Sequence, residues 1–557
     1  MFQYFNVMPG NFIIFYFIGI LATLLISGGV YFFSGRRQYK ISMAVVWIFI
    51  AASGYLLLAQ LFKYKALHMY VDFAHWLQVL QSISAKGWPE VLSHEFIFPG
   101  TLNYFAAHFV PFIYVFALPF KLIPRPETLL VLNVALMLSS AIPLYFLAKR
   151  MQGSTLFALT VAAFLLWYPT FQYITLYEFE MLRFSIPILL WMLYFWESKK
   201  IKWYFVFAFA AILVREEVGL TVAMFGLYLL LFQKRRLPGL ATFLMGLISF
   251  LVIFKFVMPA FSNAAQFEHI GAGIAPQFGN TLTGVVYGII RHPSEFFSTI
   301  LHPVKLANVG MLFIPLLFVP FVAPTALLGA LANIGIGLLS SSFIHSSYML
   351  YYIAPSIPFI FYALLKAWPK VVRYMASWKG NERRIDTNST NREFVIRNIS
   401  EHSIFVSHSA LMNTLLSAVL VSNIFFGPSP LSLQFWFKNI QPAPFRTQDF
   451  HWSVYRVTDH HKKVEKFVRM IPDDAIVSAQ EFLQPRLFKK RGAMPFPQII
   501  SKDGQYQASY VFVDRTNNNL KPESPAYMSE EEIDAVVKNG KWEFIAEKDG
   551  YELYKLL

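Results

Sequence analysis

The sequence predicts an all-α polytopic membrane domain of about twelve spans, followed by a small extracytoplasmic α/β domain. Apolar residues make up 56% of the 557-residue chain and charged residues only 14%, whereas a typical soluble domain carries roughly 25% charged residues. The mean hydropathy is +0.48. A soluble protein of this composition could not cover its surface with polar groups, so we expect the apolar runs to lie in a bilayer.

The apolar runs occur along residues 1–426. The first, residues 12–33, is long enough to cross a bilayer and lacks the basic start and cleavage site of a signal peptide. Several later runs are shorter than the roughly 20 residues of an ideal span, so we expect some to be tilted or half-buried. The predicted spans are 12–33, 41–62, 128–148, 155–173, 184–196, 203–214, 218–232, 240–258, 304–321, 323–339, 350–365 and 409–426.

Basic residues orient these spans. If the spans alternate as predicted, the basic loops fall on one side, which the positive-inside rule assigns to the cytoplasm. The outer side then holds the N-terminus, the loops 63–127 and 259–303, and everything after residue 426. Topology thus explains the net charge of +15, and nucleic-acid binding is not expected. The basic loops are 36–40, 149–150, 199–202, 234–236 and 366–408.

Residues 427–557 differ from the rest because charged residues return after Pro-rich joints. Their pattern predicts a small α/β domain that ends in a hairpin. It contains no P-loop, GxGxxG, GxSxG or HExxH motif. The chain has no cysteine, which excludes disulfides, thiolate zinc sites and cysteine nucleophiles. The expected helices are 459–470 and 530–537, and the expected strands are 475–479, 508–514, 542–547 and 551–556.

Ionisable residues at the outer rim of a membrane are costly, so they are candidates for function. Asp72 follows the second span between apolar residues, where it could act as a general base or bind a hard divalent cation. The structural alternative is an N-cap for the helix that begins there. His108 opens a hydrophobic segment, 108–121, which we expect to be an interfacial or re-entrant helix, because a further span would invert the later basic loops. The alternative for His108 is an interfacial ring without a functional role.

Two outer turns carry further candidates. Glu178, Glu180 and Arg183 lie at the first turn, where a buried Glu–Arg pair is the structural alternative. Arg215 lies at the second turn, where a cation can hold a phosphate or a lipid headgroup. The alternative is an arginine that reaches for the interface beside its own glutamates. Tyr351, at an outer mouth, either contacts a substrate or belongs to an aromatic belt.

These candidates all fall on the predicted non-cytoplasmic side, around spans rich in aromatic residues. Nucleotide cofactors are scarce on that side. An enzyme there would most simply draw an activated substrate from the lipid phase, and polyprenyl-phosphate-linked sugars are such substrates.

The order of several short motifs resembles a known family. The motifs are Val71-Asp72-Phe73, His108-Phe109-Val110-Pro111, Trp167-Tyr168-Pro169, Tyr177-Glu178-Phe179-Glu180, Arg215-Glu216-Glu217, Tyr351-Tyr352-Ile353-Ala354-Pro355 and Val477-Ser478-Ala479-Gln480. The chain resembles a bacterial family of uncharacterised multi-pass membrane proteins, best over residues 70–230. That family is similar in layout to the GT-C glycosyltransferases, which use lipid-phosphate-linked sugars.

The resemblance implies roles for the candidates. Asp72 would be the catalytic base, and Arg215 would hold the donor phosphate. His108 matches the family's loop histidine, so Asp72 and His108 could hold a divalent metal, Mg or Mn; no other cofactor is implied. The chain departs from the family at Ala106-Ala107, where Gly-Asp is expected, and at Phe179-Glu180, where Phe-His is expected. The first departure removes an acid beside His108, which argues against a metal site there. The remaining residues expected to line the substrate site are Glu178, Glu180, Arg183 and Tyr351.

The predicted function is a GT-C-like transferase that moves a sugar from a polyprenyl-phosphate carrier to an acceptor at the outer face of the bacterial cytoplasmic membrane. One alternative is a transporter or lipid flippase of the cell envelope, although no inverted repeat is visible and the ionisable groups lie at one rim. A second alternative is a non-catalytic envelope scaffold, for which Asp72 and Arg215 could be changed without loss. The sugar, the acceptor and the oligomeric state do not follow from the sequence.

Overall fold

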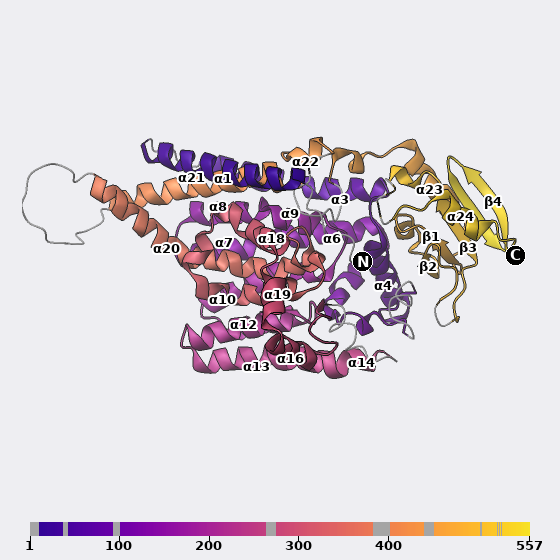
Figure 1. Cartoon of the computed structure of the whole chain (residues 1–557), viewed down its shortest axis with the longest axis horizontal. Coiled ribbons are helices and arrows are strands. Elements are labelled where there is room, and N and C mark those ends of the chain that lie inside the picture. The colour runs from indigo at the N-terminus through magenta and orange to yellow at the C-terminus, as the bar shows by residue number, and fades with distance from the viewer. Residues whose placement is uncertain are drawn as a thin grey trace, which may run out of the picture.

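In the computed structural model, a body of helices carries a small β-sheet at one end, and the C-terminal end of α20 (Ile357–Glu382) and the N-terminal end of α21 (Glu401–Phe426) lie at the other end (Figure 1). The structure describes residues 10–36, 43–92, 101–262, 274–382, 401–438, 440, 450–501, 504–520, 522, 524 and 526–557. The predicted basic loops at 36–40 and 366–408 lie partly outside these residues.

Most helices of residues 10–436 follow the predicted apolar runs, whereas α4, α5, α16, α17 and α22 lie outside them. The first, α1 (Gly10–Arg36), lies beside α21 along one edge of the body (Figure 1). The second predicted span is broken at Ser53-Gly54 into two helices. The other α-helices are α2 (Met43–Ala52), α3 (Tyr55–Lys65), α4 (Val71–Lys86), α5 (Tyr114–Leu122), α6 (Pro126–Ser139), α7 (Ala141–Gln152), α8 (Thr155–Leu166), α9 (Pro169–Leu176), α10 (Ser185–Glu197), α11 (Ile201–Ile212), α12 (Val218–Leu231), α13 (Arg236–Val252), α14 (Met258–Ala260), α16 (Leu282–Arg291), α17 (Pro293–Ile300), α18 (Pro303–Phe313), α19 (Leu328–Leu339) and α22 (Leu433–Trp436).

Among the described residues, five helical segments are long and apolar enough to cross a membrane, or seven if each of two bent helix pairs counts as one span. The membrane class is thereby supported, whereas the count of twelve stays a prediction. The reason is length: α10, α11 and α12 have 13, 12 and 14 residues, fewer than a bilayer requires. The span predicted at 155–173 bends by 51° between α8 and α9, because Pro169 cannot continue the hydrogen bonding of α8.

Small residues bring α12 and α13 into close contact. A Cβ atom on Gly226 would lie 2.3 Å from the backbone nitrogen of Phe243, and one on Gly246 would lie 2.4 Å from the carbonyl oxygen of Gly219. Only glycine permits this approach, as in small-residue packing of membrane helices. The contact fixes α12, whose N-terminal end follows the turn that carries Arg215.

The outer loop predicted at 63–127 contains α4 and α5. The interfacial helix expected at 108–121 begins later than predicted, with a 3₁₀ turn at Pro111–Ile113 before α5. On α5, Phe116 and Phe120 are buried against the protein, whereas Leu118 is exposed. A helix of nine residues with apolar side chains on both faces agrees with a short interfacial element rather than a span.

The C-terminal part folds into one five-stranded sheet with the order β2-β1-β3-β5-β4. Strand β1 lies between β2 and β3 and pairs in parallel with both, and the hairpin β4–β5 at the other edge is antiparallel. The predicted helices and hairpin are confirmed, and β2 was not predicted because Gly-Ala-Met-Pro shows no alternation of apolar and polar residues. The elements are β1 (Ile476–Ala479), β2 (Gly492–Pro495), β3 (Tyr510–Asp514), β4 (Trp542–Lys548), β5 (Tyr551–Leu556), α23 (Asp459–Met470) and α24 (Glu530–Val537).

Candidate functional site

Asp72 lies in the first turn of α4, at the second helical position. One of its carboxylate oxygens, Oδ2, accepts a hydrogen bond from the Tyr177 hydroxyl at 2.7 Å. The interpretation of Asp72 as the helix N-cap is wrong, because the N-cap residue is Tyr70. The free backbone N–H of Phe73 is instead bound by Oε2 of Glu178, at 3.1 Å, from a distant turn. Asp72 is therefore not needed to cap α4.

The turn after α9 presents Glu178 and Glu180, and both side chains are buried. Burial, together with the charge of Asp72, raises the pKa of Glu178 to about 8. Burial likewise raises the pKa of Glu180 to about 7, against the opposing charge of Arg215. Both acids in this turn are therefore harder to ionise than a free glutamate.

Arg183 stabilises this turn through hydrogen bonds of its guanidinium. Its guanidinium is fully buried and donates to the side chain of Asn133 at 3.1 Å and to the backbone carbonyl of Glu178. The predicted Glu–Arg partnership thus involves a carbonyl rather than a carboxylate of Glu178. These contacts position the turn, and Nε of Arg183 lacks a hydrogen-bond acceptor among the described residues.

Arg215 lies in the turn before α12, and only 5% of it is exposed. Its Nη2 hydrogen-bonds to Nε2 of His108 at 3.0 Å. A carboxylate oxygen of Glu217 lies 3.2 Å from its Nε, and one of Glu180 lies 3.7 Å from its Nη1. Both of these nitrogens nevertheless lack a hydrogen-bond acceptor among the described residues. Because buried N–H groups are normally satisfied, Arg215 has the capacity to bind one more acceptor.

His108 bridges Arg215 and Glu216. A guanidinium can only donate, so Nε2 of His108 must be the unprotonated nitrogen, and Nδ1 carries the proton that it donates to Glu216 at 2.7 Å. Both ring nitrogens are thereby used, and a cation at Nε2 would face the guanidinium. No group of three or more His, Asp or Glu side chains within the described ranges could hold a metal ion. The predicted metal role of His108 does not fit this arrangement.

Tyrosine rings connect Asp72 with Arg215. The ring of Tyr177, which binds Asp72, lies 5.2 Å from the ring of Tyr351. The Arg215 guanidinium lies over the same Tyr351 ring at 5.7 Å, a distance at which a cation is attracted by the ring face. The fold therefore brings all seven predicted residues into one cluster, which we call the Asp72–Arg215 cluster: Asp72, His108, Glu178, Glu180, Arg183, Arg215 and Tyr351.

Sequence reasoning missed two residues that bind members of this cluster. Glu216 was treated as a flanking partner of Arg215, although it also binds His108 and the backbone N–H of Phe109. Tyr177 was quoted in a motif but received no role, because nothing local marks a tyrosine hydroxyl as the partner of an aspartate 105 residues away.

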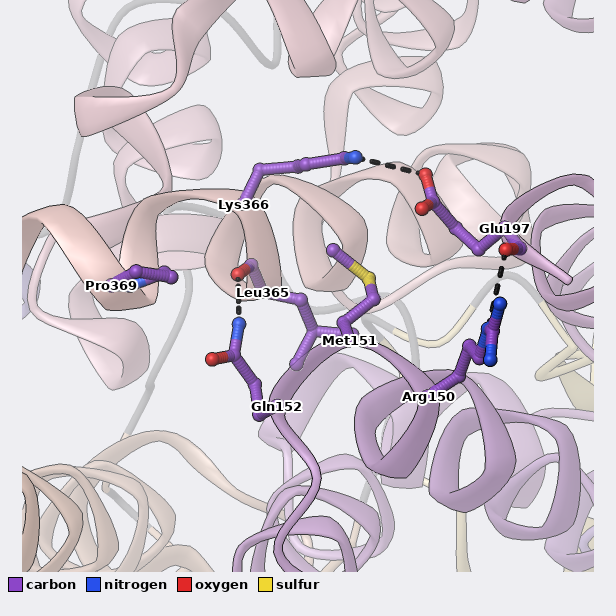
Figure 2. A pocket seen from close by; sticks show the side chains of 7 residues that line it. All are labelled: Arg150, Met151, Gln152, Glu197, Leu365, Lys366 and Pro369. Atoms are coloured by element: carbon purple, nitrogen blue, oxygen red, sulfur yellow. Dashed lines mark hydrogen bonds and ion pairs between the residues drawn. The ribbon is translucent and has the colours of Figure 1, made fainter.

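A hollow of about 350 Å³ lies elsewhere, between the C-terminal ends of α7 and α10 and the side of α20 (Figure 2). Its polar groups satisfy one another: Lys366 pairs with Glu197 at 2.9 Å, and Arg150 donates to the carbonyl of Glu197. Cations are favourable near helix C-termini. We therefore interpret this basic rim as helix capping at the predicted cytoplasmic side, and the Asp72–Arg215 cluster as the candidate functional site.

The fold and the cluster together define a helical membrane protein with a buried acid–base site and a terminal α/β sheet. A family described as predicted membrane protein (DUF2079) matches residues 63–553, and the chain belongs to this family. The predicted membership in a family of uncharacterised multi-pass membrane proteins is confirmed.

Solved structures that are similar to the chain include ArnT from Cupriavidus metallidurans bound to undecaprenyl phosphate, with 13% identity, coverage of 92% of this chain and 98% of that chain, and a TM-score of 0.46. Another is the archaeal oligosaccharyltransferase AglB from Archaeoglobus fulgidus in complex with an inhibitory peptide and a dolichol-phosphate, with 12% identity, coverage of 90% and 74%, and a TM-score of 0.38. No curated protein matches the chain.

Proposed function

We propose that the chain is an integral membrane glycosyltransferase. It transfers a sugar from a polyprenyl-phosphate-linked donor to an acceptor at the outer face of the bacterial cytoplasmic membrane. The observation that carries the proposal is the pairing, within one largely buried cluster, of an oriented carboxylate with an arginine whose Nε and Nη1 lack a hydrogen-bond acceptor among the described residues. Asp72 has one oxygen fixed by Tyr177, and Arg215 has two unsatisfied nitrogens.

In the proposed reaction, an acceptor hydroxyl attacks the anomeric carbon of the donor sugar. Asp72 takes the hydroxyl proton, and the bond between the anomeric carbon and the phosphate oxygen breaks with its electron pair on oxygen. The carrier phosphate passes from one negative charge to two, and the unsatisfied N–H groups of Arg215 bind this developing charge. A donor group aimed at charge that forms during the reaction stabilises the transition state more than the ground state.

The acids around Arg215 impose a condition on donor binding. Glu180, Glu216 and Glu217 all approach the guanidinium, and fully ionised they would repel a phosphate. Burial raises the pKa of Glu216 and of Glu217, and it raises the pKa of Glu180 to about 7. We therefore expect the phosphate to bind when some of these acids are protonated, and to bind less tightly as the pH rises above 7.

The test uses purified protein in liposomes and a panel of polyprenyl-phosphate-linked hexoses, with release of polyprenyl phosphate as the measurement. Asp72→Asn keeps the size of the side chain and an acceptor for Tyr177 but removes the base. We expect release to fall by roughly 10²–10⁴-fold while the yield of folded protein persists. The matched control is Glu90→Gln, an acid that pairs with Lys86 just after α4. An Asp72→Asn protein with full activity would exclude Asp72 as the base.

A proton-coupled transporter is the second candidate, and one observation favours it. Glu178 and Glu180 are buried acids whose pKa values lie near 8 and 7, as proton coupling requires. The two functions can be distinguished in sealed liposomes that contain a polyprenyl-phosphate-linked hexose. A transporter acidifies or alkalinises the lumen on addition of its substrate without breaking a glycosyl bond, whereas a transferase releases polyprenyl phosphate without a proton flux.

A further inference from the structure

The C-terminal sheet is fixed to the joint between α3 and α4. The side-chain amide of Asn518 donates to the backbone carbonyls of Ala66 and Leu67, both at 3.1 Å. Arg486 donates to the carbonyl of Tyr64 at 3.0 Å and covers its ring at 4.0 Å. The joint that leads to Asp72 is therefore held by residues of two 3₁₀ turns that connect strands of the sheet.

Leu67 shows how specific this attachment is. Its φ is 59°, a left-handed conformation that leucine rarely adopts. Its side chain is 1% exposed and packs within the core of the sheet, with Val477 and Phe512. A leucine in this conformation persists only when its surroundings hold it there. The relative position of α4 and the sheet is thus determined by packing as well as by hydrogen bonds.

Glu481 lies just before the segment of the C-terminal part that contacts α4. It follows the end of β1 and precedes the 3₁₀ turn Gln484–Leu487, which packs against α4. Burial and the charge of Asp72 raise its pKa to about 7, which agrees with a carboxyl group near Asp72. Glu481 forms no hydrogen bond or ion pair with any residue that the structure describes.

The topology of the sheet also marks this position. The chain leaves β1 for β2 on one side and returns to β3 on the other side. In open α/β sheets, ligands bind outside the carboxyl ends of the strands where the strand order reverses. Glu481 stands at the carboxyl end of β1, at this point.

We propose that Glu481 is a further residue of the catalytic site, which holds a hydroxyl-bearing acceptor opposite Asp72. The site is then built by both the helical part and the sheet. Asp72 removes the proton from the acceptor hydroxyl, and Glu481 binds a neighbouring hydroxyl group. The acceptor role rests on the proposed function, whereas the juxtaposition of the two carboxyl groups does not.

Proximity can be tested first, since the natural chain contains no cysteine. We expect the double variant Asp72→Cys, Glu481→Cys to be cross-linked by a short bis-maleimide in the full-length protein. The control pair, Asp72→Cys with Glu530→Cys, places the second thiol at an exposed position of α24. The bis-maleimide should not cross-link this pair. Absence of the Asp72–Glu481 cross-link would overturn the proposal.

The acceptor role is tested by kinetics with a polyprenyl-phosphate-linked hexose as donor and decyl maltoside as the hydroxyl-bearing acceptor. We expect Glu481→Gln to raise the KM for decyl maltoside about 10-fold, with the donor KM and the melting temperature unchanged. Glu481→Asp should be intermediate. An unchanged acceptor KM in an active variant overturns the acceptor role alone. A parent protein that releases no polyprenyl phosphate overturns the proposed function, and the acceptor role with it, while the cross-link still reports the geometry.

Discussion

The hydroxyl of Tyr177 donates to Oδ2 of Asp72 at 2.7 Å, so a tyrosine from the turn after α9 fixes the carboxylate on α4. Tyr177→Phe removes this bond and keeps the ring that packs against Tyr351. Because a hydrogen bond to a charged group contributes about 1.5–3 kcal/mol, we expect transfer to fall roughly 10- to 100-fold with little change in melting temperature. Tyr287→Phe, at an exposed tyrosine, is the control. Equal turnover in the parent and Tyr177→Phe would show that the bond does not orient the base.

Arg215 allows charge and geometry to be separated. Glutamine removes the charge, and lysine keeps the charge without the planar fork. If Arg215 binds the carrier phosphate, Arg215→Gln should weaken binding of polyprenyl phosphate by roughly 10- to 100-fold, with Arg215→Lys intermediate. Binding can be measured by tryptophan fluorescence in detergent, with Arg291→Gln on exposed α16 as the control. Loss of thermal stability in both variants with unchanged phosphate binding would assign Arg215 a structural role.

Glu178 gives the fold a pH dependence. Its pKa is raised from 4.5 to about 8 by burial and by Asp72. Between these values the folded chain binds more protons than the unfolded chain, so the free energy of unfolding falls as the pH rises through this window. Glu178→Gln keeps the acceptor for the backbone N–H of Phe73 but cannot titrate. In Glu178→Gln, the fall in the free energy of unfolding over this pH window should therefore be smaller by roughly 1–4 kcal/mol than in the parent.

Melting temperatures of the detergent-solubilised protein between pH 4.5 and 8.5 provide the measurement for Glu178. The parent should lose stability steadily over this range, whereas Glu178→Gln should show a flatter profile. The control Glu90→Gln, at a partly exposed acid, should follow the parent. Parallel profiles for the parent and Glu178→Gln would contradict the assignment.

The topology prediction concerns the side on which the Asp72–Arg215 cluster lies. Reporter fusions after Arg150, Lys200 and Arg236 should be cytoplasmic, because these residues lie in the basic loops 149–150, 199–202 and 234–236. A fusion after Leu557 should be extracytoplasmic. A cytoplasmic C-terminus would move the sheet, and the cluster that it contacts, to the wrong side for the proposed donor.

Composition and local patterns determined the class of this protein and part of its architecture. The low content of charged residues predicted a membrane protein. The alternation of apolar and charged residues predicted a helix with the same first and last residues as α23. Charged residues in apolar surroundings also marked Asp72, His108 and Arg215 as candidates, because such residues are costly unless they have partners. These are properties of short segments, and short segments can be interpreted without a fold.

Only the tertiary structure decided what each candidate does. The N-cap interpretation of Asp72 was locally reasonable, but Glu178 reaches the start of α4 from another turn and binds the free N–H there. The tautomer of His108 depends on Arg215 and Glu216, which lie more than 100 positions away. Hydrogen bonds and burial between distant segments set protonation and orientation, and neither leaves a periodic signal in the sequence. For this reason the sequence could name the residues of the cluster but not their partners.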